Sequence, residues 1–287
     1  MKAKLPLIIC FFYSVTAFSQ SQFLTNGLFS YVDTLKIPNT YEIGPGQLTK
    51  SGDHFILGLL DGELEDYVNL MSDIYAIDLN PNANDKKIQP FNLPNAPDSV
   101  RYFQCSASNK EEVVVYVSNL FAGWNDNDLA IAVKQADGSY GKTRMLTELN
   151  DPLESDAYPW LSPDGLHIYY NRNFKILYAE RNSIQDSFSA PVEIKFDGQV
   201  NLEIVSSWLS EDEKNMFIIA NNRIYYASRK STSEPFSFPA LFTDEFKSFY
   251  FISGLSFAPD RKTMVLYYST EDKQTIVRYQ LKKGKAW

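Results

Sequence analysis

The chain has 287 residues, 44% hydrophobic and 22% charged, which is the composition of a globular protein with room for one large domain or two ordinary ones. The net charge of −8 argues against nucleic acid and anionic membrane surfaces as partners. Beyond the N-terminus no segment has the ~18 apolar residues of a membrane helix, so we expect a chain that does not span a membrane. The 18 Tyr and 20 Phe residues favour β structure.

The N-terminus has the three parts of a secretory signal in the right order. Lys2 and Lys4 supply positive charge, residues 5–12 form a short apolar stretch, and Ala17 and Ser19 provide small residues at a cleavage site. We therefore predict a signal peptide over residues 1–19 and a single domain over residues 20–287, exported to the periplasm or the extracellular space. Cleavage leaves Cys105 as the single cysteine, so no intrachain disulfide is expected.

One local pattern recurs five times along the rest of the chain. Its clearest copy, residues 161–170, has an apolar residue, the turn residues Ser162, Pro163, Asp164 and Gly165, and then a run of apolar and aromatic residues. We align the turn residues Thr49, Ser106, Ser162, Ser210 and Ala258, whose separations are 57, 56, 48 and 48 residues. Propeller blades repeat every ~40–50 residues, so this spacing predicts five blades with loop insertions in the first two.

Each unit continues with two further strands. The predicted third strands are residues 74–79, 129–134, 176–181, 224–228 and 276–281, and the predicted fourth strands are residues 88–93, 140–146, 188–194 and 236–242. The fifth unit has no fourth strand of its own, but residues 29–37 resemble residues 188–194. We therefore predict an all-β, five-bladed β-propeller in which this N-terminal strand completes the last blade and closes the ring.

The third unit carries a family resemblance. Residues 156–165, followed by residues 176–181 and 188–192, resemble the TolB-type, WD-like propeller repeat that is common in bacterial envelope proteins. The fourth and fifth units match this repeat less closely, and the first two match it weakly. The resemblance implies a propeller in the cell envelope, but it implies no single function, because repeats of this type serve many.

Long connections favour a binding function. Residues 58–73 and residues 118–128 join the second and third strands of the first two units, whereas the same connections in the third and fourth units are short. Such insertions are natural places for specificity, and a protein or glycan of the envelope is the expected partner. The candidate binding residues are Arg172 and Arg223 in the short connections and, in the long ones, Asp61, Glu65, Tyr67, Phe121, Trp124, Asn125 and Asp126. The alternative is that these are merely solvated loops on a structural scaffold.

Glycoside hydrolysis is the enzymatic alternative, because several glycosidase families use a five-bladed ring with carboxylates in its axial pocket. Glu42, Asp156 and Glu203 all lie near the start of an innermost strand and are the candidate catalytic residues. No clear acid or nucleophile motif surrounds them, so we expect a binding or scaffold module rather than an enzyme.

Two pairs of residues recur at fixed repeat positions. His54 and His167 both follow the hairpin turn, and Trp160 and Trp208 both stand two residues before the turn residue. Because the repeat geometry fixes these positions, it favours packing roles for all four. The chain has no His or Cys cluster of metal-site spacing and no phosphate-binding glycine loop, so we expect neither a metal nor a cofactor.

Overall fold

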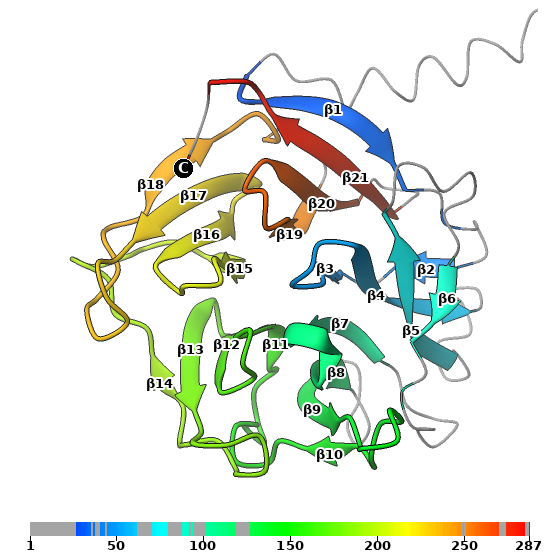
Figure 1. Ribbon diagram of the computed structural model, residues 1–287. Coiled ribbons are helices and arrows are strands. Elements are labelled where there is room, and N and C mark those ends of the chain that lie inside the picture. Colours follow the sequence, from blue (N-terminus) through cyan, green and yellow to red (C-terminus); the bar gives the residue numbers. More distant parts are fainter. Residues whose placement is uncertain are drawn as a thin grey trace, which may run out of the picture.

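The computed structural model describes residues 27–35, 37, 41–43, 45–61, 71–79, 88–91, 93, 102–118, 127–247, 249, 251–269, 274–284 and 287. Five small antiparallel sheets stand around a central axis, and Figure 1 views them along that axis. This arrangement confirms the predicted five-bladed β-propeller. The signal peptide predicted for residues 1–19 lies outside the described residues.

The first two blades contain the longer predicted connections. The strands of the first blade are β2 (Tyr41–Ile43), β3 (Gln47–Leu48), β4 (His54–Asp61), β5 (Met71–Asp78) and β6 (Ile88–Pro90). Here β2 and β3 both pair with β4, so together they take the innermost position. The strands of the second blade, from the axis outward, are β7 (Tyr102–Ala107), β8 (Val113–Ser118), β9 (Asp128–Val133) and β10 (Arg144–Met145).

The third and fourth blades are four-stranded meanders that run outward from the axis. The strands of the third blade are β11 (Ala157–Leu161), β12 (His167–Arg172), β13 (Lys175–Glu180) and β14 (Val192–Glu193). Those of the fourth blade are β15 (Ile204–Leu209), β16 (Asn215–Ala220), β17 (Arg223–Ser228) and β18 (Ala240–Thr243).

The fifth blade joins the two ends of the described chain. Its inner strands are β19 (Phe251–Phe257), β20 (Thr263–Ser269) and β21 (Gln274–Leu281), and its outer strand is β1 (Phe29–Thr34). β1 pairs antiparallel with β21 from Phe29 opposite Leu281 to Thr34 opposite Val277, and Figure 1 shows the two strands side by side. The predicted closing strand is therefore present, and it closes the ring so that no blade is left incomplete.

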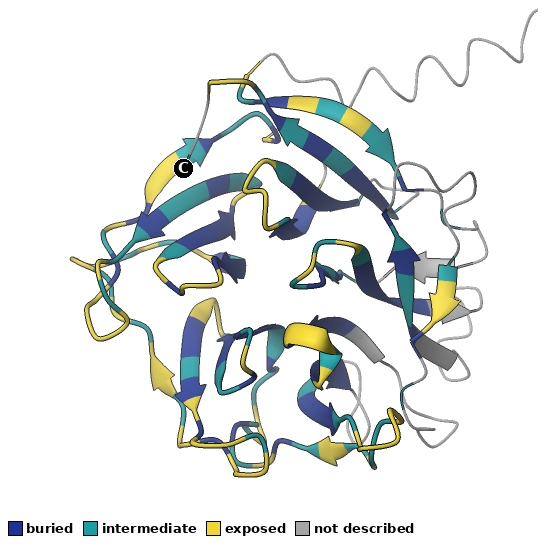
Figure 2. Cartoon of the chain, in the orientation of Figure 1, coloured by how far each residue is buried: buried dark blue, intermediate teal, exposed yellow. Residues whose placement is uncertain are grey.

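Burial follows from the position of each strand in its blade. β8 is buried at all six positions because its sheet is covered by a neighbouring blade on each side, which explains the unbroken run of valines. The rim strand β14 is exposed at both positions. Figure 2 shows the inner strands mostly buried, with exposed residues on the outer strands and in the turns. Across the described ranges, no helix has the length and apolar character to cross a membrane.

The prediction that Ser106 is the turn residue of the second unit is wrong by two residues. Ser108 takes that place, because its N–H donates to Val113 O and its Oγ accepts from Val113 N–H, both at 2.9 Å, as Ser162 does with His167. A 3₁₀ turn, η2 (Asn109–Glu111), replaces the Pro-Asp-Gly turn here. The corrected separations are 59 residues from Thr49 to Ser108 and 54 from Ser108 to Ser162.

Candidate functional site

The strand order gives the ring two different ends. Because neighbouring strands are antiparallel, hairpins from first to second strands lie at one end, and connections from second to third strands lie at the other. We call these the turn end and the loop end. Each innermost strand starts at the loop end, so the candidate residues Glu42, Asp156 and Glu203 belong there. The hairpin turns of the five units surround the axis at the turn end (Figure 1).

The described parts of the innermost strands enclose a small cavity at the axis. In blades two to five, each of these strands has an irregularity in register at a similar place, for example between Phe103 and Cys105. Such bulges re-aim side chains. This cavity has a volume of about 20 Å³, and all five innermost strands contribute to it. Gln47 Nε2 donates to Pro159 O at 2.8 Å, and Tyr158 N–H donates to Gln104 Oε1 at 2.7 Å. The space suits about one water molecule, and its described lining includes no carboxylate.

A larger cavity of about 150 Å³ opens at the turn end. The hairpin turns of blades one, four and five form it together with Trp287. We call it the turn-end cavity. Its apolar wall includes Trp208, Phe257 and Trp287, and its charged residues are Lys50, Glu211 and Arg261. Apolar walls with a few polar groups are typical of ligand sites.

Trp287 is held in this wall by aromatic neighbours. Its ring centroid lies 6.0 Å from that of Trp208, 5.2 Å from that of Phe257 and 4.8 Å from that of Phe217. The guanidinium carbon of Arg261 lies 5.2 Å from the Trp287 ring centroid. The indole Nε1 of Trp287 is buried and has no hydrogen-bond partner among the described residues. A buried donor without a partner carries a desolvation cost, which lowers the net stability of this wall.

Lys50 is a cation of the cavity whose pKa is strongly perturbed. The residue is half-buried, and its Nζ lies 4.1 Å from the ring centroid of Trp160 in the third blade. Burial lowers the pKa of Lys50 to about 7, although the charges of Glu211 and Glu213 act in the opposite direction. A strongly perturbed titratable group in a cavity marks a candidate functional site.

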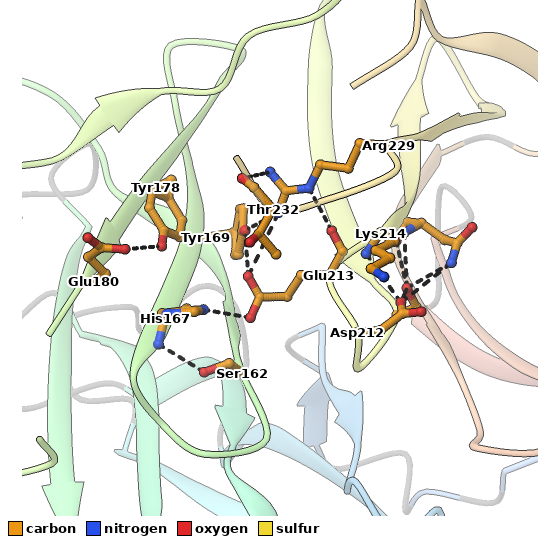
Figure 3. A network of polar contacts seen from close by, with 12 residues as sticks. Ser162, His167, Tyr169, Tyr178, Glu180, Asp212, Glu213, Lys214, Arg229 and Thr232 are labelled. Carbon is orange, nitrogen blue, oxygen red and sulfur yellow. Dashed lines mark hydrogen bonds and ion pairs between the residues drawn. The ribbon is translucent and has the colours of Figure 1, made fainter. Parts of the chain in front are cut away.

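A polar network beside the cavity ties the third blade to the fourth (Figure 3). Glu213 is buried on the β15–β16 turn, where its φ is 56°. His167 Nδ1 lies 2.6 Å from Glu213 Oε1, and Tyr169 OH donates to Glu213 Oε2 at 2.7 Å. Arg229 Nη2 donates to Tyr169 OH at 2.7 Å, and Arg229 Nε donates to Glu213 O at 2.9 Å. Glu213 is therefore fully occupied by protein groups, which indicates a structural clamp rather than a catalytic acid.

This clamp should make stability depend on pH. The hydrogen bond to Glu213 raises the pKa of His167 above its ordinary value of 6.5. Protonated His167 therefore adds stability that is complete below the unfolded pKa and is lost as pH rises through the raised folded pKa. We expect His167→Gln to destabilise the protein more at about pH 6 than at about pH 9, measured by urea unfolding. A loss of stability in His167→Gln that is the same at both pH values would contradict the assignment.

Two of the three carboxylates predicted as catalytic candidates have different surroundings in the structure. Asp156 is fully buried, and its two oxygens accept from Arg172 Nε at 2.8 Å and Arg172 Nη2 at 2.9 Å. Burial raises the pKa of Asp156 to about 6, against the opposing effect of Arg172. Glu203 is exposed just before β15, and Glu42 lies in β2 with its side chain outside the described residues. Neither Asp156 nor Glu203 is among the described residues that line the axial cavity.

Most of the predicted loop residues lie outside the described part of the chain. These are Glu65, Tyr67, Phe121, Trp124, Asn125 and Asp126, together with the side chain of Asp61, whose backbone ends β4. Of the two remaining candidates, Arg172 is bound to Asp156, and half-buried Arg223 donates from Nη1 to Asn221 O at 3.4 Å.

Sequence reasoning missed the charged residues of the turn-end cavity. A signal for them exists in the repeat, because Lys50 and Glu211 each directly follow an aligned turn residue, where the third and fifth units have Pro163 and Pro259. The charged residues at this position, which is proline in other units, could have been singled out as candidate site residues. Trp208 was predicted only as a packing residue; it is buried, as that prediction requires, and it also lines the cavity.

Comparisons with known proteins point to the fold. No protein-family model matches the chain, and no curated protein matches it. Among solved structures, a GH43_1 enzyme from Xanthomonas citri is 9% identical with a TM-score of 0.58, and the match covers 90% of this chain and 93% of that one. A protein assigned as TolB from Agrobacterium tumefaciens is 13% identical with a TM-score of 0.48, covering 81% of this chain and 72% of that one.

A puromycin hydrolase is 12% identical with a TM-score of 0.46, and 89% of this chain matches only 37% of that chain. This chain thus spans less than two fifths of the hydrolase. At such low identity, the similarity to the GH43_1 enzyme shows the propeller fold alone, and the function has to be argued from the site.

Proposed function

We propose that the chain is an exported, non-catalytic binding module that recognises a protein or a glycan of the bacterial cell envelope. The observation that carries this proposal is the turn-end cavity of about 150 Å³, whose wall includes Trp208 and Trp287 and whose polar groups are Lys50, Glu211 and Arg261. Buried aromatic rings beside a few charged groups are the usual anchors of recognition sites. The signal-like residues 1–19 and the TolB-type pattern of the third unit support export and an envelope setting.

The arrangement of carboxylates favours binding over glycoside hydrolysis. Hydrolysis needs two carboxyl groups that flank one bond, about 5–9.5 Å apart. The described lining of the turn-end cavity has one carboxylate, Glu211, and that of the axial cavity has none. Asp156 is held by Arg172, so it is already committed to an ion pair. The glycosidase alternative would therefore depend on Glu42 and Glu203 at the loop end.

A comparative pull-down from envelope extract tests the proposal. The wild type is compared with Trp287→Ala at the turn end and with Trp124→Ala in the long connection of the second unit. We expect Trp287→Ala to lose a specific partner, because the substitution removes a wall of the cavity. An unchanged melting temperature of this variant would show that the ring is intact. Loss of a partner with Trp124→Ala alone would indicate that the predicted loops are the recognition site. Equal recovery of every partner by all three proteins would contradict recognition at both places.

Chromogenic glycosides test the enzymatic alternative directly. We expect no turnover by the wild type. Turnover that is abolished by Glu203→Gln would establish the glycosidase function and overturn the binding proposal.

A further inference from the structure

We propose that the turn-end cavity holds one six-membered sugar ring, either a free monosaccharide or the terminal residue of a glycan. The inference rests on the proposed binding function and names the chemical class of the ligand. It concerns the turn end of the ring, whereas the glycosidase alternative considered above concerns the axial pocket and the loop end.

The size of the cavity sets the first limit. Its volume is about 150 Å³. A protein cavity of roughly this volume accommodates one six-membered ring. The site is therefore large enough for a single pyranose ring and too small to enclose an oligosaccharide, which would have to enter by its end.

The wall of the cavity suits the faces of such a ring. Trp208 and Trp287 stand with their ring planes 86° apart and their centroids 6.0 Å apart, so they offer two differently oriented apolar surfaces. A pyranose ring has apolar C–H faces and a polar hydroxyl edge. Tryptophan combines a large apolar surface with one N–H donor, so it can contact both parts of the sugar.

The polar groups distinguish a sugar from other small rings. Lys50 and Arg261 are donors, whereas Glu211 is an acceptor. A hydroxyl group both donates and accepts, so a polyhydroxylated ring can satisfy both kinds of group. An aromatic carboxylate would satisfy the donors but would be repelled by Glu211. A purely apolar ring would form no hydrogen bond with Lys50, Arg261 or Glu211.

The experiment is a titration followed by intrinsic tryptophan fluorescence and calorimetry. The probes are methyl β-glucoside, methyl β-galactoside and the methyl β-glycoside of N-acetylglucosamine, with benzoate and cyclohexanol as ring-sized comparators. We expect at least one glycoside to bind with a Kd on the order of 1 mM, the weak range that a ligand of about a dozen heavy atoms allows. Trp287→Ala should weaken binding at least about tenfold by removing a stacking surface.

Matched variants and a glycan array complete the test. Glu211→Gln should weaken glycosides but strengthen benzoate, and Phe174→Ala, at an exposed residue of the loop end, should change neither. Binding of array glycans with the same terminal sugar would identify a glycan end, and binding of the monosaccharide alone would identify a free sugar. Benzoate or cyclohexanol binding as tightly as every glycoside, or no glycoside binding, would overturn the inference. If Trp287→Ala still loses a partner in the pull-down, the proposed function survives that failure.

Discussion

Replacing Arg172 with leucine is expected to lower the free energy of unfolding by about 3–5 kcal/mol, because it leaves a buried carboxylate without its partner. Asp156 is 0% exposed and the side chain of Arg172 is 17% exposed. Arg172 also donates from Nη2 to Leu149 O at 2.5 Å, and its Nη1 lies 3.5 Å from Asp151 Oδ2. One guanidinium thus holds the segment between the second and third blades against β12.

The controls separate the loss of the pair from the loss of a charge. Arg144→Leu breaks the exposed pair with Glu148, where the arginine side chain is 45% exposed, and it should cost less than about 1 kcal/mol. The double variant Arg172→Leu with Asp156→Leu should recover much of the stability, because replacing both partners by apolar groups is often nearly neutral. Urea unfolding gives all three values. Equal losses in the Arg172 and Arg144 variants would show that the buried pair contributes little.

The fold could be predicted from sequence because its determinants are local and repeated. A turn residue such as Ser162, followed by a run of buried residues, marks each hairpin, and five copies fix the number of blades. The alignment of the second unit failed because the turn at Asn109–Glu111 uses the positive φ angles of Lys110 (54°) and Glu111 (57°) instead of Pro-Asp-Gly. The error of two residues kept the alternation of faces, so the blade itself was still predicted.

The candidate site could not be predicted in the same way, because it is assembled from turns that are distant in sequence. Lys50, Glu211 and Arg261 come from three different blades, and only the closed ring brings them around one cavity. Residues at similar positions in their repeat units can also have different surroundings. Asp156 and Glu203 both precede an innermost strand. Asp156 is buried and binds an arginine that lies 16 residues later in the chain, whereas Glu203 is exposed. Position in a repeat predicts the backbone, whereas the partner of a side chain depends on neighbouring residues that differ between units.

The second large effect is expected at the strand that closes the ring. Phe29 on β1 is 0% exposed, and its ring centroid lies 6.0–6.4 Å from those of Phe242, Phe246, Phe257 and Tyr279. Phe29→Ala should lower the free energy of unfolding by about 3–5 kcal/mol, because it removes this contact area and leaves a cavity between the fourth and fifth blades. Val32→Ala, on the same strand but 43% exposed, should cost less than about 1 kcal/mol.

Hydrogen exchange can show which strands are destabilised by Phe29→Ala. Among the described strands, β1 pairs only with β21, and the ion pair of Asp33 with Arg278 at 2.6 Å also joins the two strands. If β1 closes the ring, Phe29→Ala should speed exchange of the β21 amides more than exchange of the β8 amides in the second blade, because the outer strand would detach before the ring unfolds. Uniform acceleration in both strands would instead mean that the ring unfolds as one cooperative unit. A loss in Phe29→Ala no larger than that in Val32→Ala would mean that closure by β1 contributes little to stability.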